Sequence, residues 1–212
     1  MTTTSFVKFA LECEALQFGD FTLKSGRQSP YFFNAGKFNS GAAFRELGRY
    51  YANRLVETGL AFDLLFGPAY KGIPLATAVA MALDQDHAKS VGVAFNRKEA
   101  KTHGEAGTLI GAPMQGDVVI IDDVITAGTA IRESIGLIEA AGARPAGVVV
   151  ALDRQEKGPH GKSAIQEVEQ TYNIPVFAIA KLENLLEFAR SEPNLADQLE
   201  LLTAYRQAYG VD

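Results

Sequence analysis

The chain has 212 residues, enough for one well-filled core or for one domain with an appendage. Hydrophobic residues make up 47% and charged residues 21%, which is ordinary for a globular protein and argues against disorder. A net charge of −5 argues against nonspecific binding to nucleic acid or to anionic membranes, because both need a basic surface, although it does not exclude a local basic site.

Cysteine content and hydrophobic runs bear on the compartment. The single cysteine, Cys13, cannot form an internal disulfide, which fits a reducing compartment. The best candidate for a membrane span, residues 72–83, is shorter than the roughly 20 residues that a spanning helix needs. The N-terminal stretch carries Glu12 and Glu14 without a basic lead, so it does not resemble a signal peptide. We therefore expect a soluble cytoplasmic protein.

The N-terminal part of the chain predicts two helices and a hairpin. Residues 3–17 have hydrophobic side chains at helical spacing. The segments FTLK (21–24) and SPYFFN (29–34) flank the turn SGRQ and predict a hairpin. A long amphipathic helix is expected at 40–58, where a glycine follows its last residue.

Beyond residue 60, short hydrophobic strands alternate with helices. The strands are hydrophobic throughout, which is typical of strands that crossover helices bury on both faces. Strands are predicted at 63–67, 90–96, 117–122, 146–152 and 175–180, and helices at 72–83, 128–141, 163–172 and in the C-terminal region. The pattern predicts a single α/β domain, 1–212, with a mainly parallel central sheet flanked by helices. Residues 1–36 are expected to form a small hood over the carboxyl edge of the sheet.

The strongest candidate site is the stretch VVIIDDVITAGTAIRES, residues 118–134. A buried strand ends in Asp122 and Asp123, and the small-residue turn TAGT (126–129) then opens a helix. Ligands of open α/β sheets gather beyond the carboxyl ends of the strands, and a helix N-terminus suits a phosphate. The two carboxylates would repel that phosphate, so they suit the hydroxyls of an attached sugar or a hydrated Mg²⁺.

This stretch has two other interpretations. A strand end with solvated acids and a helix cap is the plain structural alternative, which the complete TAGT turn disfavours. A P-loop nucleotidase would need the pattern G-x-x-x-x-G-K-[ST]. The nearest match, GPAYKGI (67–73), has Ile73 where the lysine belongs.

The segment DDVITAGTA (122–130) resembles the motif with which type I phosphoribosyltransferases bind 5-phosphoribosyl 1-pyrophosphate (PRPP). The resemblance implies that the two acids hold the ribose hydroxyls while the turn grips the 5-phosphate. The residues that it assigns to PRPP are Asp122, Asp123, Val124, Ile125, Thr126, Ala127, Gly128, Thr129 and Ala130.

Four further stretches resemble bacterial orotate phosphoribosyltransferases, in the right order along the chain. They are FTLKSGRQSPYFFNAG (21–36), FGPAYKGIPLA (66–76), FNRKEAKTHGE (95–105) and LDRQEKG (152–158). The resemblance covers essentially the whole chain. It implies a glycosyltransferase of pyrimidine biosynthesis that converts orotate and PRPP to orotidine 5-monophosphate and pyrophosphate, with Mg²⁺ as cofactor.

Cationic residues are expected to meet the phosphates of PRPP. Tyr70 and Lys71 follow a strand and open a helix, so the resemblance places them on PRPP, with Lys24 nearby. It also assigns to a lid over pyrophosphate four side chains that fall within seven residues: Arg97, Lys98, Lys101 and His103. A solvated charged loop is the alternative for this segment.

The resemblance also implies roles in catalysis and in binding the base. Orotate carries a carboxylate, and Arg154 just past a strand end can supply a forked set of donors. A surface salt bridge is the alternative for that arginine. Phe32, Phe33 and Thr126 are the other residues implied in orotate binding.

The predicted mechanism relies mainly on positioning and on neutralising the charge of the leaving pyrophosphate. Lys101, Asp122 and Asp123 are the expected catalytic residues. No protein metal ligands are assigned, because Mg²⁺ should bind mainly through pyrophosphate, ribose and waters.

The family implies a homodimer with a shared active site and no nucleic-acid or membrane partner. In an extended lid, residues 97, 101 and 103 would share one face and reach the neighbouring subunit, while Lys98 would serve its own site. Two alternatives stay open: the same fold acting on a purine or another pyrimidine, and a non-catalytic regulator that senses PRPP or nucleotide.

Overall fold

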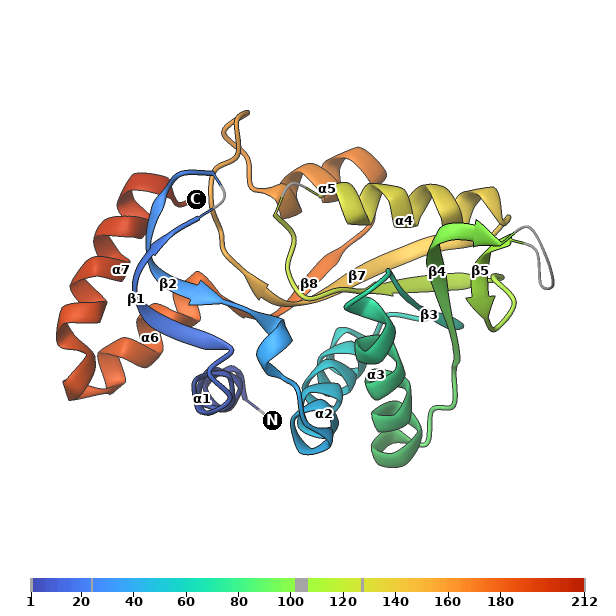
Figure 1. Cartoon of the computed structure of the whole chain (residues 1–212), viewed down its shortest axis with the longest axis horizontal. Coiled ribbons are helices and arrows are strands. Elements are labelled where there is room, and N and C mark those ends of the chain that lie inside the picture. Colours follow the sequence, from blue (N-terminus) through green and yellow to red (C-terminus); the bar gives the residue numbers. More distant parts are fainter. Residues whose placement is uncertain (1, 24, 102–106, 127, 212) are drawn as a thin grey trace.

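The protein is described from a computed structural model that covers residues 2–23, 25–101, 107–126 and 128–211, apart from the side chains of 99–101 and 107. A six-stranded sheet in the order β5-β4-β3-β6-β7-β8 forms its centre (Figure 1). β5 pairs antiparallel with β4, and the other neighbours are parallel. The strands are β3 (Leu64–Gly67), β4 (Gly92–Lys101), β5 (Gly107–Gly111), β6 (Asp117–Ile121), β7 (Arg144–Asp153) and β8 (Val176–Lys181). The predicted mainly parallel α/β fold is confirmed.

Helices cover both faces of this sheet. The pair α4 (Thr129–Ala140) and α5 (Ala164–Tyr172) lies above it in Figure 1, and α2 (Gly41–Thr58) and α3 (Gly72–His87) lie below. Successive residues of β6 point to opposite faces, as in any strand. Val118 and Ile120 therefore join the core under α4 and α5, while Val119 and Ile121 join the core on the other face.

The N-terminal segment packs against the C-terminal helices at one end of the sheet (Figure 1). It consists of α1 (Thr3–Glu12), β1 (Leu16–Thr22), β2 (Gln28–Phe33) and a short 3-10 turn, η1 (Ala35–Lys37). It contacts α6 (Leu182–Ser191) and α7 (Ala196–Tyr209), which the turn η2 (Pro193–Leu195) joins. Phe6, Tyr31 and Tyr205 belong to the same buried cluster as Val119, so this end shares a core with the sheet.

Three expectations about the elements were wrong. The first strand of the hairpin, expected at 21–24, lies at Leu16–Thr22. The helix expected at 3–17 ends at Glu12, since Glu14 adopts a left-handed conformation with φ of 55° and β1 begins at Leu16. The polar stretch after 96 continues as strand to Lys101, and the antiparallel β5 that pairs with it was not predicted.

The other predicted boundaries are close to those observed. α2 starts behind Ser40, whose hydroxyl accepts the backbone N–H of Ala43, and ends at Gly59 with a φ of 66°. α3 runs past the expected residue 83 as far as His87. None of the helices in the described part of the chain is both long and apolar enough to cross a membrane.

Candidate active site

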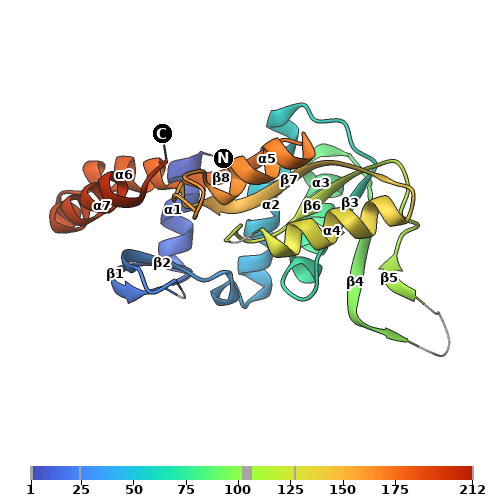
Figure 2. The same ribbon diagram turned by 90° about the horizontal axis from the view of Figure 1, so that it is seen from above.

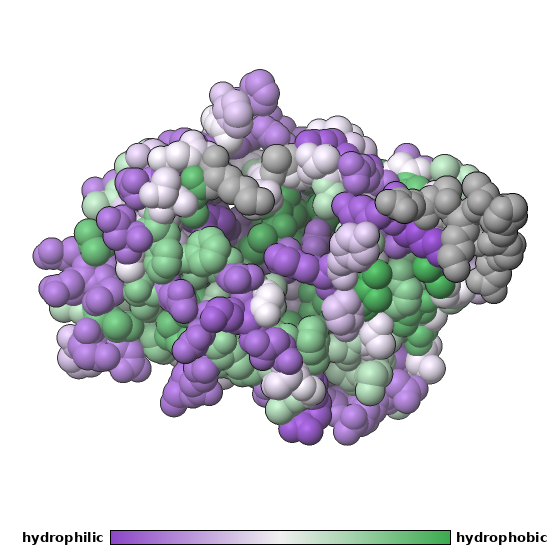
Figure 3. Space-filling view, in the orientation of Figure 1, coloured by the Kyte–Doolittle hydropathy of each residue, from purple (hydrophilic) through white to green (hydrophobic). Residues whose placement is uncertain are grey.

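The candidate site lies where three neighbouring parallel strands end. β3, β6 and β7 are adjacent and parallel, so their carboxyl ends meet at one edge of the sheet. Lys71 follows β3, the acid pair follows β6, and Arg154 follows β7. In Figure 3, strongly hydrophilic and hydrophobic residues lie side by side in the recessed centre of one face of the molecule.

Asp122 and Asp123 are buried at the end of β6, each with 8% of its surface exposed. The carboxylate of Asp122 accepts the backbone N–H of Asp123 at 2.9 Å. The carboxylate of Asp123 accepts the N–H of Val124 at 2.9 Å and the ammonium of Lys71 at 2.8 Å. These hydrogen bonds, two of them to neighbouring backbone and one to Lys71, orient both side chains.

The environment of Asp122 changes its ionisation. Burial, and next the neighbouring charge of Asp123, raises the pKa of Asp122 to about 7, and the positive charge of Lys71 partly offsets this shift. Asp122 can therefore hold or release a proton near neutral pH. A carboxyl group of this kind can donate to or accept from a sugar hydroxyl.

A tyrosine of α2 supports the acid pair from below the sheet. The hydroxyl of Tyr51, which is fully buried, donates to the backbone carbonyl of Asp122 at 2.7 Å. Burial raises the pKa of Tyr51 well above its usual value, so it stays a hydrogen-bond donor. Sequence reasoning missed this residue, because it lies on the hydrophobic face of α2 and looks like an ordinary core residue.

The turn after the acids leads into the start of a helix, where Gly128 itself is buried. Gly128 has a φ of 70°, a left-handed conformation that favours glycine, and it precedes the first turn of α4. No side chain caps this N-terminus among the described residues, so its N–H groups can meet an anion. Thr126, Thr129 and Ala130 are exposed.

The other residues expected in the turn differ in exposure. The side chain of Ile125 is buried and that of Val124 is half-buried. A ligand would therefore contact the backbone groups of these residues more readily than their side chains. Ala127 lies outside the described residues.

The loop between β3 and α3 carries Tyr70 and Lys71 to the same edge. Gly67 and Gly72 approach each other closely: a Cβ on Gly67 would lie 2.2 Å from the carbonyl oxygen of Gly72. The backbone N–H of Ala69 donates to the side chain of Asn96 on β4 at 2.7 Å. Tyr70 and Lys71 are exposed, and the ammonium of Lys71 turns toward Asp123. This loop is therefore tied to β4 and to the acid pair.

The expected lid corresponds to β4 and β5, which extend beyond the body of the molecule (Figure 2). Arg97 is half-buried and Lys98 is exposed, with its ammonium 6.0 Å from the ring centre of Tyr70. The backbone of Lys101 ends β4. His103 lies outside the described residues, as does Lys24 of the hairpin.

Phe32 and Phe33 point to opposite sides of β2. Phe32 is 38% exposed and stacks on Phe21, with 5.5 Å between ring centres. Phe33 is 8% exposed and packs beside Phe38 in the core. Phe32 is thus the side chain of this pair that a flat ligand can reach.

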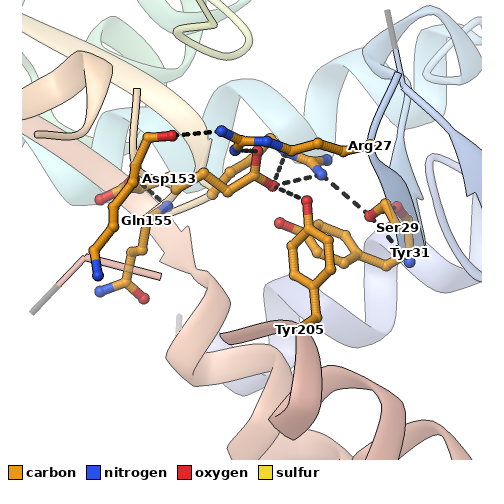
Figure 4. Close-up of polar contacts among 9 residues, drawn as sticks. Arg27, Ser29, Tyr31, Asp153, Gln155 and Tyr205 are labelled. Carbon is orange, nitrogen blue, oxygen red and sulfur yellow. Dashed lines mark hydrogen bonds and ion pairs between the residues drawn. The ribbon is translucent and has the colours of Figure 1, made fainter. Parts of the chain in front are cut away.

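Figure 4 shows a polar cluster in which residues of the hairpin, of the end of β7 and of α7 meet, among them Ser29 and Tyr205. Arg154 belongs to this cluster through its hydrogen bonds. Its guanidinium donates through Nε to Glu156 at 2.7 Å and through Nη2 to Ser29 at 3.2 Å. It also lies 4.3 Å from the ring centre of Tyr31. Arg154 does form a salt bridge, with Glu156 at 2.7 Å, but its side chain is only 12% exposed, so the pair is buried and does not lie on the surface.

Comparisons with known proteins agree with this geometry. The family model "Phosphoribosyl transferase domain" matches residues 37–179. An orotate phosphoribosyltransferase of Hahella chejuensis is 56% identical over 98% of this chain and 96% of its own length, and one of Serratia proteamaculans is 58% identical over 97% of each. The chain belongs to the orotate phosphoribosyltransferase family. This confirms the resemblance in the sequence.

A solved structure extends the match to three dimensions. The crystal structure of the orotate phosphoribosyltransferase of Francisella tularensis has a TM-score of 0.89 and 43% identity, and the match covers 97% of this chain and 99% of that one. Membership of the orotate phosphoribosyltransferases argues against the alternatives of a purine-specific enzyme and of a non-catalytic regulator.

Proposed function

We propose that this chain transfers the 5-phosphoribosyl group of PRPP to orotate and thereby forms orotidine 5-monophosphate and pyrophosphate in pyrimidine biosynthesis. In this reaction the bond between C1 of the ribose and the pyrophosphate oxygen breaks, and a bond between C1 and N1 of orotate forms. The nucleophile is orotate that has already lost its N1 proton, and the electrons of the broken bond leave with pyrophosphate.

The observation that carries the proposal is the placement of an acid pair and an arginine on neighbouring strands. Asp122 and Asp123 at the end of β6 suit the ribose hydroxyls, and the turn at Gly128 suits the 5-phosphate. Arg154 follows the adjacent β7 and suits the carboxylate of the base. The sugar would then lie between its phosphate and its base.

Side chains around these groups would hold the two substrates. Phe32 is placed to stack on the pyrimidine ring, while Phe33 would support it from the core and Thr126 would contact the base. Tyr70, Lys71, Lys98 and Lys24 would contact PRPP, together with the residues of the 122–130 segment.

We further propose that Lys101 neutralises the departing pyrophosphate, with Arg97 and His103 beside it in the lid. Mg²⁺ when bound would draw charge from the leaving group. The described residues include no group of three or more His, Cys, Asp or Glu that could hold a metal ion, whereas Asp122 and Asp123 offer oxygen atoms near the sugar. Such a pair fits a hydrated Mg²⁺ held mainly by pyrophosphate, ribose and waters.

A homodimer with shared lids is also part of the proposal, since β4 and β5 project from the body of the subunit (Figure 2). The net charge of −5 and the single cysteine support a cytoplasmic enzyme without nucleic-acid or membrane partners.

The test is an assay that follows the absorbance of orotate. The purified protein, with PRPP and Mg²⁺, should consume orotate and release one pyrophosphate for each orotate lost. Adenine and uracil, supplied in place of orotate, should react much more slowly. Failure to consume orotate by folded protein would overturn the proposed function.

A further inference from the structure

Glu156 joins three parts of the chain, since it contacts Arg154, Tyr205 and Arg27. Its carboxylate accepts from Nε of Arg154 at 2.7 Å and from the hydroxyl of Tyr205 on α7 at 2.8 Å. It also lies 3.6 Å from a guanidinium nitrogen of Arg27, which follows the tip of the β1–β2 hairpin. Arg27 in turn donates to the backbone carbonyl of Lys157 at 2.7 Å.

The charges of this hydrogen-bonded set do not balance. Arg27 and Arg154 bring two positive charges, and Glu156 brings one negative charge. Side chains of Arg154 and Glu156 are only 12% and 16% exposed, so water screens them poorly. Asp153, which Figure 4 draws in the same cluster, is not joined to Glu156, and its carboxylate accepts the backbone N–H of Gln155.

The contacts of Arg154 also hold its guanidinium group in one plane. Glu156 accepts from Nε and lies 2.7 Å from Nη2, and Ser29 accepts from Nη2. The ring of Tyr31 covers one face of the guanidinium plane at 4.3 Å. Tyr205 adds a further hydrogen bond to the guanidinium. Glu156 and its neighbours therefore fix the plane in which Arg154 presents its donors.

We propose that Glu156 is a positioning residue that orients Arg154 toward the carboxylate of the base, with Tyr205 and Arg27 holding Glu156 in place. The inference rests on the proposed function. It makes specificity for an anionic pyrimidine depend on α7 and on the hairpin as well as on the end of β7. Glu156 itself has no contact with substrate in this role.

The test compares two substrates in Glu156→Gln, which keeps the size of the side chain and removes its charge. The KM for orotate should rise about tenfold or more, which is the range for losing a charged hydrogen bond, while the KM for PRPP changes less than about twofold. Asp86→Asn, which breaks the Arg49–Asp86 ion pair at 2.8 Å on α2 and α3, is the matched control and should leave both KM values unchanged.

A second comparison separates positioning from general support of the fold. In an Arg154→Ala background, Glu156→Gln should add less than about a twofold change in the KM for orotate, because residues that act through one contact are not additive. A full additional tenfold rise, or an equal rise of both KM values in the single variant, would overturn the inference.

If thermal unfolding shows that Glu156→Gln does not fold, Tyr205→Phe provides a second test. It removes the hydroxyl that hydrogen-bonds with Glu156 and Arg154 and keeps the ring, so the KM for orotate should rise about threefold while the KM for PRPP is unchanged. An unchanged KM for orotate in this variant would overturn the inference. Unmodified protein that cannot use orotate would instead overturn the proposed function.

Discussion

The ammonium of Lys71 lies 2.8 Å from Oδ2 of Asp123, across 52 positions of the sequence. The lysine side chain is 60% exposed, whereas that of Asp123 is only 11% exposed. The contact thus joins a solvent-facing cation on the β3–α3 loop to a buried anion at the end of β6. We infer that Lys71 screens Asp123 in the free protein and turns to PRPP when it binds.

Replacing Lys71 by alanine should affect both binding and stability. The lysine is 60% exposed, but its loss leaves the buried carboxylate of Asp123 without its charged partner, which should lower the unfolding free energy by about 1–3 kcal/mol. A charged hydrogen bond to a phosphate contributes about 1.5–3 kcal/mol, so the KM for PRPP should rise by about ten- to a hundredfold. Urea denaturation and initial rates measure the two effects. A large loss of stability with an unchanged KM for PRPP would contradict this role.

Asp122→Asn should make the protein more stable at high pH relative to the unmodified chain. Burial, and next the charge of Asp123, raises the pKa of Asp122 from 3.8 to about 7 on folding. The folded state thus keeps a proton that the unfolded state has lost, and this contribution to stability is fully present below about pH 4 and lost as pH rises through about 7. Asparagine does not ionise. Its advantage in unfolding free energy should grow between pH 4 and 8, by up to about 4 kcal/mol.

Denaturation in urea at pH 5, 6, 7 and 8 measures this difference. The control is Asp117→Asn, because the hydrogen bond from Arg144 lowers the pKa of Asp117, and its contribution is present above the unfolded pKa and lost as pH falls. Its difference from the unmodified protein should stay constant over this range. Turnover should fall in both Asp122→Asn and Asp123→Asn, and full activity in both would mean that the acids do not hold the sugar.

Tyr51→Phe tests the support beneath the acid pair. The change leaves the ring in place but removes the 2.7 Å hydrogen bond to the backbone carbonyl of Asp122. A buried carbonyl without its partner should lower the unfolding free energy by about 1–3 kcal/mol. The displaced acid should also lower kcat. Tyr209→Phe, on α7, is the matched control and should change neither quantity.

Arg154→Ala should weaken the use of orotate selectively. Truncating one partner of a buried, hydrogen-bonded charge pair costs about 2–5 kcal/mol, which should appear in kcat/KM for orotate. PRPP binding, measured by calorimetry, should change little. Loss of PRPP binding with an unchanged affinity for orotate would show that Arg154 binds PRPP and does not bind orotate.

Mixing two inactive variants tests whether lids are shared across a dimer. If Lys101 serves the neighbouring subunit, exchange between Lys101→Ala and Asp123→Ala subunits gives heterodimers with one site that has both groups. Half of the dimers are heterodimers after random exchange, so activity should reach about a quarter of that of the unmodified protein, by symmetry. If mass spectrometry shows that subunits exchange but activity stays at the background level of the two separate variants, the active site is not shared between subunits.

Residues with a local signal were predicted well. The uninterrupted hydrophobic runs predicted β3, β6, β7 and β8, because strands buried on both faces have no polar positions. The acids at 122 and 123 were found because a strand end, a small turn and a helix start follow one another in sequence. The position of the two acids at a strand end was predictable because the signal lies in neighbours close in the chain.

Residues whose roles depend on distant contacts were not predicted. Glu156 stands in the segment DRQEKG and looks like a solvated charge, yet its partners Arg27 and Tyr205 come from opposite ends of the chain. Phe32 and Phe33 look alike in sequence, and only the pairing of β2 with β1 determines which one faces outward. The short β5 has two glycines in five residues and little strand propensity, so its pairing with β4 left no local signal.

The contact between Tyr205 and Glu156 has a consequence for the order in which the two halves of the site form during synthesis. A ribosome that has just completed β7 has already made Asp122, Asp123 and the turn at Gly128. It must add some fifty further residues before Tyr205 can reach Glu156, because α7 follows β8 and α6. A nascent or shortened chain that lacks α7 should hence acquire its PRPP contacts before its selectivity for the base.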